Sequence, residues 1–276
     1  MKVRILTSIG IGIVGIPILI FSKYIVFPIA LSLFALFAVY EMLRVLGAEK
    51  KHFISVPVYL MALAFPIGAF FARDDKVIPY LMCLAGVLFG YLLYLFFFAV
   101  FMRGSVKYTQ ISEIFSSVTY IVASFTALSV IRYMPNGVWN LSLVFLAAWG
   151  TDIFAYFVGT FIGKHKLIPE ISPKKTVEGS VGAIILDIGA FILFGFIVSL
   201  ATDVSANYLI LALSGLLLSV ISQLGDLIAS LIKREHGVKD YGNILPGHGG
   251  IMDRFDSVLA VTTVLMMICI LFPPFV

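Results

Sequence analysis

Charged residues are scarce in this sequence. Only 12% of its 276 residues are Asp, Glu, Lys or Arg, whereas soluble domains average roughly a quarter. Hydrophobic residues make up 61% of the chain and the mean hydropathy is +1.08. Too few polar side chains remain to cover a water-exposed surface, which excludes an ordinary soluble globule and indicates a polytopic membrane protein.

Cysteine is also scarce. Cys83 and Cys269 are the two cysteines, and each lies inside an apolar run. That placement favours small buried hydrophobic residues and excludes a disulfide framework or a cysteine metal cluster. The sequence also lacks a P-loop and a nucleophilic-serine elbow. The apolar N-terminus has no small-residue cleavage site, so we expect a retained span and not a signal peptide.

Apolar runs long enough to cross the hydrocarbon core, about 20 residues each, recur along the whole chain. They predict nine transmembrane helices, near 5–22, 24–40, 53–72, 77–101, 115–132, 138–162, 179–201, 207–232 and 255–275. A backbone in contact with lipid must satisfy its own hydrogen bonds, so every span should be helical. The expected fold class is therefore an all-α polytopic membrane protein.

The placement of lysine and arginine predicts the orientation of these spans. With a cytoplasmic N-terminus, all 19 lysines and arginines except Lys23, Arg73, Lys76 and Arg132 fall on the cytoplasmic side. The positive-inside rule favours that arrangement. It predicts a protein of the cytoplasmic (inner) membrane whose loops 163–178 and 233–254 both face the cytoplasm.

Polar residues concentrate in the second half of the chain, after residue 149. We therefore predict an N-terminal transmembrane scaffold over 1–140 and a C-terminal catalytic transmembrane region over 141–276. The two unusual loops follow the sixth and eighth predicted spans, so they can meet on one face of the membrane.

Three aspartates lie within or near apolar spans: Asp152, Asp187 and Asp226. A carboxylate at membrane depth is costly, so it usually faces a cavity, a partner or an ion. For Asp187, an internal salt bridge or a protonated structural carboxyl is an equally good interpretation, and the role of Asp152 stays open.

Asp226 belongs to a polar stripe. Ser222, Asp226, Ser230 and Lys233 follow one another at steps of four, four and three residues, so they share one helical face. This stripe leads into the loop 233–254 and favours a functional role for Asp226.

Carboxylates also mark the start of the last predicted span. Asp253 and Asp256 are three residues apart, again on one face. Hard oxygen ligands from neighbouring helices suit Mg²⁺, which is commonly held by one or two carboxylates and substrate phosphates. His248 has no second histidine or cysteine at ligand spacing, so a zinc site is not indicated, and we expect it to act as a hydrogen-bonding residue.

Glycines and cations surround these carboxylates. Gly249 and Gly250 belong to a "GHGG" run whose successive N–H groups could form an anion-binding nest. The basic residues around the run are Lys233, Arg234, Lys239 and Arg254. A cluster that binds anionic lipid headgroups would explain these cations, but not the carboxylates between them. In the loop 163–178, Lys174 and Lys175 favour phosphate capture, with a solvated basic loop as the alternative.

These residues carry a resemblance to a known family. The segment 230–256 resembles the signature of CDP-diacylglycerol synthases (phosphatidate cytidylyltransferases). The matching residues are Ser230, Ile232, Lys233, Arg234, Lys239, Asp240, Gly242, Leu245, Pro246, His248, Gly249, Gly250, Ile251, Asp253, Arg254, Phe255 and Asp256. The upstream segment "TDIFAYFVGTFIGKHKLIPEISPKKTVEG" is similar to a second region of the family, and together the resemblance covers roughly residues 145–260.

The resemblance implies a reaction, cofactors and an assembly. CTP and phosphatidic acid would give CDP-diacylglycerol and pyrophosphate, with Mg²⁺, a second cation (K⁺), and a homodimer in the membrane. Asp226 and Asp253 would hold Mg²⁺, while Asp256 and Asp240 orient or complete the ion site. The remaining expected substrate-binding residues are Lys174, Lys175, Ser230, Lys233, Arg234, Lys239, His248, Gly249, Gly250 and Arg254.

Other functions are weighed against this one. A CTP-dependent kinase of a lipid alcohol, such as polyprenol or phytol, would use the same nucleotide but depend more on a general base. An anion transporter would show matched polar breaks in both halves of the chain, and residues 1–140 show none. A lipid-binding scaffold is the weakest alternative, because the buried carboxylates would only destabilise it. We expect no nucleic acid among the partners.

Overall fold

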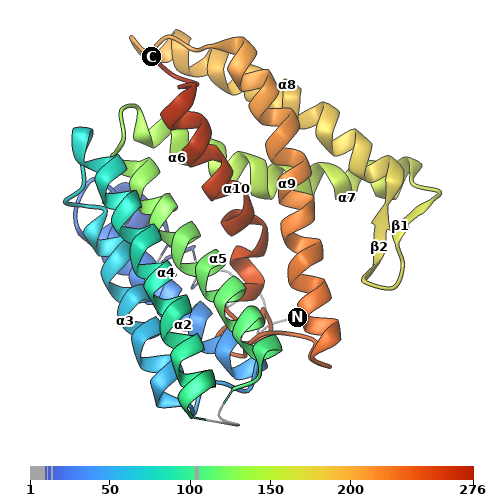
Figure 1. Cartoon of the computed structure of the whole chain (residues 1–276). Coiled ribbons are helices and arrows are strands. Elements are labelled where there is room, and N and C mark those ends of the chain that lie inside the picture. Colours follow the sequence, from blue (N-terminus) through green and yellow to red (C-terminus); the bar gives the residue numbers. More distant parts are fainter. Residues whose placement is uncertain (1–9, 11, 14, 103–105) are drawn as a thin grey trace. The chain divides into compact units, whose positions relative to one another are not determined.

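The computed structural model describes residues 10, 12–13, 15–102 and 106–276 (Figure 1). Its chain forms two compact units, one made of residues 1–133 and 238–254 and the other of residues 134–237 and 255–276. The first boundary lies close to the predicted one at 140/141, but the loop before α10 belongs to the first unit. The assignment of scaffold and catalytic roles to these parts stays a prediction.

Helices build the first unit. They are α2 (Val26–Val45), α3 (His52–Gly68), a short 3₁₀ turn η1 (Asp74–Lys76), α4 (Val77–Phe101) and α5 (Tyr108–Tyr133). Helices α2, α3 and α5 pack against one another, and α4 packs against α5. Two backbone carbonyls near the end of α3 accept hydrogen bonds from side chains of α2 and α5. Ser32 Oγ donates to Leu63 O and Ser129 Oγ donates to Pro66 O, each at 2.8 Å.

The second unit contains α6 (Gly137–Phe145), one turn of π-helix η2 (Leu146–Gly150), α7 (Thr151–Ile162), α8 (Val177–Ala201) and α9 (Tyr208–Glu235). It also holds most of α10 (Met252–Leu271). Helix α8 packs against both α7 and α9. Gly159 and Gly163, whose spacing suits helix packing within or between chains, lie against Thr176 of the same chain.

A two-stranded antiparallel hairpin interrupts this helical unit. Strands β1 (Lys166–Ile168) and β2 (Ser172–Thr176) pair with Lys166 opposite Thr176, between the end of α7 and the start of α8. The sequence did not predict these strands, because three to five residues are too few to show an alternating pattern.

Seven helices in the described part of the chain are long and apolar enough to cross a membrane, judged by length and composition. They match the predicted spans 24–40, 77–101, 115–132, 138–162, 179–201, 207–232 and 255–275. The predicted span 53–72 corresponds to α3, which has 17 residues, and the predicted span 5–22 falls partly outside the described residues, at 5–9, 11 and 14. The all-α polytopic class is thus confirmed, while the count of nine and the orientation stay predictions.

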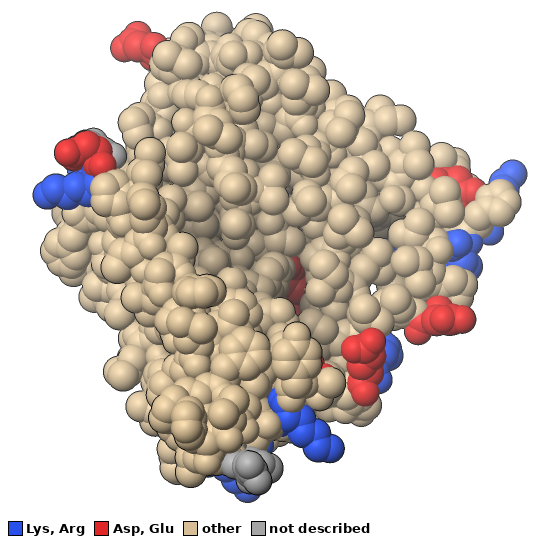
Figure 2. Space-filling view, viewed as in Figure 1, with Lys and Arg blue, Asp and Glu red and all other residues tan. Residues whose placement is uncertain are grey.

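Charged side chains are sparse on the viewed face, which is mostly uncharged (Figure 2). One group of them lies over the β1–β2 hairpin. This distribution agrees with a multi-pass membrane protein whose polar chemistry is confined to few places.

Candidate functional site

The hairpin is fastened to the start of α8 by two side chains. Thr176 is the N-cap of α8, and its hydroxyl accepts a hydrogen bond from Gly179 N at 3.2 Å. The Glu178 carboxylate accepts hydrogen bonds from the backbone N–H groups of Lys164 and His165, and it lies 2.6 Å from His165 Nδ1. An N-cap hydroxyl and a carboxylate in the first turn both stabilise a helix start. Together they fix the direction in which β2 presents its side chains.

Lys175, at the end of β2, forms an ion pair with Asp226 of α9. Its Nζ lies 2.6 Å from Asp226 Oδ2, and the two side chains are 19% and 27% exposed. The neighbouring Lys174 is exposed to solvent, as expected from the alternation of side chains along a strand. The structure therefore brings Lys175 from one predicted site segment to Asp226 from another.

Asp256 of α10 belongs to the same group. It interacts electrostatically with Asp226, Lys233 and Asp152, and Asp152 interacts with Lys175 and Asp226. We call Asp152, Lys175, Asp226, Lys233 and Asp256 the carboxylate–lysine cluster. Every member lies in the second unit, on α7, β2, α9 or α10.

A glycine allows α9 and α10 to approach closely beside this cluster. A Cβ atom on Gly225 would lie 2.6 Å from Ala260 Cβ and 2.9 Å from Asp256 O. Only a residue without a side chain fits between the two backbones. Gly225 directly precedes Asp226, so this contact sets the spacing of the two helices at the point where Asp226 and Asp256 stand.

Asp187 lies in a second polar group of this unit and is fully buried. Its Oδ2 accepts a hydrogen bond from Thr151 Oγ1 at 2.5 Å, and Thr151 Oγ1 also bonds Ser219 Oγ at 3.2 Å. Thr151 directly follows η2, and in η2 the Ala148 carbonyl accepts a hydrogen bond from Ser222 Oγ at 3.4 Å. No salt bridge of Asp187 is found among the described residues, and its role stays open.

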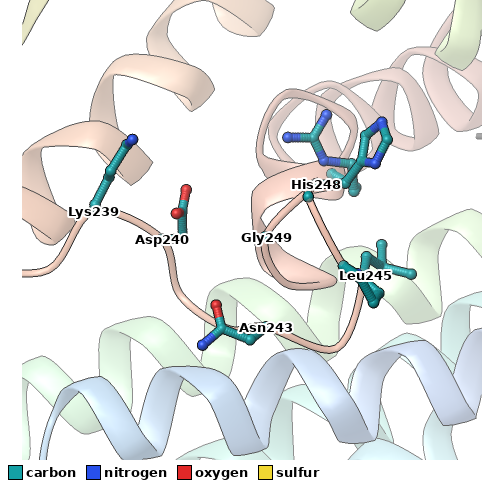
Figure 3. Close-up of a pocket in the computed structure, with 9 residues that line it drawn as sticks. Lys239, Asp240, Asn243, Leu245, His248 and Gly249 are labelled. Carbon is teal, nitrogen blue, oxygen red and sulfur yellow. The ribbon is translucent and has the colours of Figure 1, made fainter. Parts of the chain in front are cut away.

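The first unit holds a pocket of about 480 Å³ in the loop before α10. It is lined by Lys239, Asp240, Asn243, Leu245, Pro246, Gly247, His248, Gly249 and Arg254. Figure 3 shows Lys239 and Asp240 on one side of the pocket and His248 on the other, with Asn243 between them. Five predicted site residues (Lys239, Asp240, His248, Gly249 and Arg254) thus surround one cavity, whose side chains can bind an anion from several directions.

Backbone N–H groups in and beside the predicted anion nest have partners within the protein. Gly250 N donates to Asp253 Oδ2 at 3.0 Å, while Ile251 N and Met252 N donate to Glu41 at 3.1 and 2.9 Å. These N–H groups already serve carboxylates of the protein. Within the "GHGG" run, Gly250 N is therefore bound to Asp253 and His248 N donates to Leu245 O at 2.8 Å, while anion binding by the other N–H groups of the run stays a prediction.

Asp253 shapes the loop. Its Oδ2 also accepts a hydrogen bond from Tyr241 N at 2.8 Å. Asp253 and Asp256 lie in the first turns of α10, three residues apart and hence on one side of that helix. These hydrogen bonds to Tyr241 N and Gly250 N do not test the predicted metal-binding role of Asp253, which stays a prediction.

Sequence reasoning missed Glu41 and Arg44. Glu41 is 1% exposed, and Arg44 Nη2 donates to Tyr241 O at 3.0 Å. One signal was present, because Glu41 is the only acidic or basic residue among residues 24–43. Two other predicted residues, Ser230 and Arg234, lie on α9, the first half-buried and the second exposed.

A metal ion would need further ligands at either place. Among the described residues no three His, Cys, Asp or Glu side chains are grouped closely enough to hold a metal ion by themselves. The carboxylate–lysine cluster supplies hard oxygen donors, and its three carboxylates outnumber its two lysines. Such a donor set fits Mg²⁺ if substrate phosphates complete the coordination.

Comparisons with known proteins find a family and relatives that cover almost the whole chain. The model of the "Cytidylyltransferase family" matches residues 2–272. A protein of Bacillus subtilis (strain 168) named phosphatidate cytidylyltransferase is 36% identical, over 99% of this chain and 98% of its own length. Proteins with the same name from Staphylococcus haemolyticus and Staphylococcus aureus (strain COL) are 35% and 34% identical, each over 98% of this chain and 99% of their own.

Proposed function

The chain belongs to the cytidylyltransferase family, and we propose that it is a phosphatidate cytidylyltransferase. It joins CTP and phosphatidic acid to give CDP-diacylglycerol and pyrophosphate, a step of phospholipid biosynthesis. The observation that carries the proposal is the carboxylate–lysine cluster, in which Lys175 stands 2.6 Å from Asp226. Nucleotidyl transfer needs groups of this kind, cations for the phosphates and carboxylates for a metal ion.

In the proposed mechanism an oxygen of the lipid phosphate attacks the α-phosphorus of CTP in line, and pyrophosphate leaves. Lys175 and Lys233 bind phosphate oxygens beside the carboxylates. The pocket cations Lys239 and Arg254, with His248 as a hydrogen-bond donor, bind a second phosphate group. A phosphate monoester is already an anion near neutral pH, so no strong general base is required.

Asp226 and Asp253 would hold Mg²⁺, as the sequence predicts, and Asp256, one turn after Asp253, would complete the ion site. When bound, Mg²⁺ offsets the charge that develops on the pyrophosphate leaving group. Asp240, on the rim of the pocket, would orient the ion site or its substrate. The family resemblance adds K⁺ as a second cation.

We further propose a homodimer in the cytoplasmic membrane with its active site facing the cytoplasm. The support for the orientation is the distribution of lysine and arginine along the sequence. It places the reaction on the side where CTP is available.

The test supplies the purified protein with CTP and either phosphatidic acid or a lipid alcohol. Release of pyrophosphate together with CDP-diacylglycerol is expected with phosphatidic acid only. Release of CDP with the alcohol would identify a lipid kinase instead. Repeating the assay with EDTA, with Mg²⁺, and with Mg²⁺ plus K⁺ tests the metal requirements, and loss of activity in EDTA is the expected result.

A further inference from the structure

Glu41 is a buried carboxylate in a part of the chain to which the sequence assigned no chemistry. It lies near the end of α2 and is 1% exposed. Burial of a carboxylate is unfavourable unless hydrogen bonds and charges compensate for the lost hydration. The partners of Glu41 therefore indicate why a glutamate stands here.

Those partners are the first N–H groups of α10. Ile251 N donates to Glu41 Oε1 at 3.1 Å and Met252 N donates to Glu41 Oε2 at 2.9 Å. The first N–H groups of a helix have no partner within it, and the helix N-terminus attracts negative charge. Glu41 thus caps α10 with a carboxylate that comes from α2.

The same carboxylate determines the shape of the loop before α10. A Cβ atom on either Gly242 or Gly250 would coincide with the space that the Glu41 carboxylate fills. Gly250 has no left-handed backbone conformation that would itself require glycine. Its lack of a side chain is therefore explained by Glu41 alone.

Two more side chains hold the loop. Asp253 Oδ2 accepts from Tyr241 N and Gly250 N, and Arg44 Nη2 donates to Tyr241 O. The loop backbone from 241 to 252 is therefore fixed at both ends. The pocket is lined by residues inside and beside this braced segment, among them Lys239, His248 and Arg254.

We propose that Glu41 is a positioning residue for the reaction. It acts through the loop and α10, and it holds the pocket side chains in the geometry that the transferred group requires. The proposal rests on the proposed function only for its activity readout. Displacement of a reacting group by about 1 Å can lower a rate by about 10²-fold. Loss of Glu41 should therefore reduce kcat strongly, while the thermal midpoint of unfolding changes little.

The test uses the full-length protein in detergent, with activity expressed per folded molecule. Glu41→Gln keeps the side-chain volume but replaces one acceptor oxygen by an NH₂ group, which cannot accept from Met252 N. The expected result is a fall in kcat of about 10²-fold, a thermal midpoint close to that of the unmodified protein, and faster amide hydrogen exchange at residues 250–252.

A cycle with Gly250 isolates the contact. Gly250→Ala should inactivate the protein when Glu41 is present. In the Glu41→Ala background it should lower activity little further, because the clash between the new Cβ and the Glu41 carboxylate is then gone. Gly86→Ala is the matched control, since a Cβ on Gly86 of α4 meets nothing within 4 Å. It should leave activity unchanged.

Three outcomes would overturn the proposal: kcat per folded molecule unchanged in Glu41→Gln, unchanged exchange at residues 250–252, or additive losses in the Gly250 cycle. If Glu41→Gln fails to fold, Gly250→Ala and its exchange profile decide in the same way. If the unmodified protein makes no CDP-diacylglycerol, the proposed function fails, while the exchange measurement still tests the role of Glu41 in the loop.

Discussion

Replacement of Lys175 by methionine tests the carboxylate–lysine cluster most directly. Methionine keeps the length of the side chain but removes the charge that stands 2.6 Å from Asp226 Oδ2. Two unit charges ~4 Å apart interact by about 4 kcal/mol at an effective dielectric constant of ~20, whereas fully exposed pairs contribute about 0.2–1 kcal/mol. With side chains that are 19% and 27% exposed, we expect a coupling between these limits, about 1–2 kcal/mol.

The sign of the effect on metal binding follows from the neighbours of Asp226. Without Lys175, the carboxylates of Asp226 and Asp152 lose a cation that now compensates them. Mg²⁺ should then bind more tightly, by about 5- to 30-fold for a coupling of 1–2 kcal/mol, although kcat falls because a phosphate-binding cation is missing.

The assay measures thermal unfolding against Mg²⁺ concentration, because a ligand that binds the folded state raises its stability by an amount that grows with the logarithm of ligand concentration over Kd. Four proteins form the cycle: the unmodified protein, Lys175→Met, Asp226→Asn and the double variant. Lys174→Met is the matched control, since its side chain is exposed on the neighbouring position of β2. The pairing of Lys175 with Asp226 would be contradicted by equal coupling energies of Lys174 and Lys175 to Asp226. It would also be contradicted if Lys175→Met left the Mg²⁺ concentration for half-maximal stabilisation unchanged.

Two further variants probe the geometry around the cluster and the loop. Gly225→Ala should lower stability by about 1–3 kcal/mol and reduce kcat, because its Cβ would lie 2.6 Å from Ala260 Cβ. The control Gly189→Ala, whose Cβ meets nothing within 4 Å, should change neither stability nor kcat. Equal thermal midpoints for the two variants would contradict the packing argument. Asp253→Asn should abolish turnover while the protein still purifies in folded form, and activity like that of the unmodified protein would remove Asp253 from the metal site.

Helices and the polar stripe of α9 were predictable because their signals are local. The apolar run at 77–101 coincides with α4 (Val77–Phe101), since hydropathy depends on composition within one segment. The spacing of Ser222, Asp226, Ser230 and Lys233 likewise placed them on one helix, and all four lie in α9 (Tyr208–Glu235).

The contacts that build the site were not predictable in the same way, because they join segments far apart in the sequence. Glu41 bonds to N–H groups about 210 positions later, and no local pattern encodes that pairing. The backbone partners beside the glycine run were unpredictable for the same reason: the glycines at 249–250 give the freedom that a nest needs, but Gly250 N donates to Asp253 and the next two N–H groups donate to Glu41. The π-helical turn at Leu146–Gly150 depends on packing as well, and the hairpin strands are too short to show a pattern.

The charges of the cluster explain why a metal ion belongs to the proposed reaction. The cluster contains three carboxylates, Asp152, Asp226 and Asp256, and two lysines, Lys175 and Lys233. In its fully ionised form it therefore carries an excess of negative charge, which repels a triphosphate. One divalent cation reverses the sign of that group and makes it attractive to phosphate oxygens. The lysines cannot do this alone, since the carboxylates already outnumber them. In the proposed reaction the carboxylates would serve the nucleotide through a cation, and this role would account for their cost inside an apolar protein.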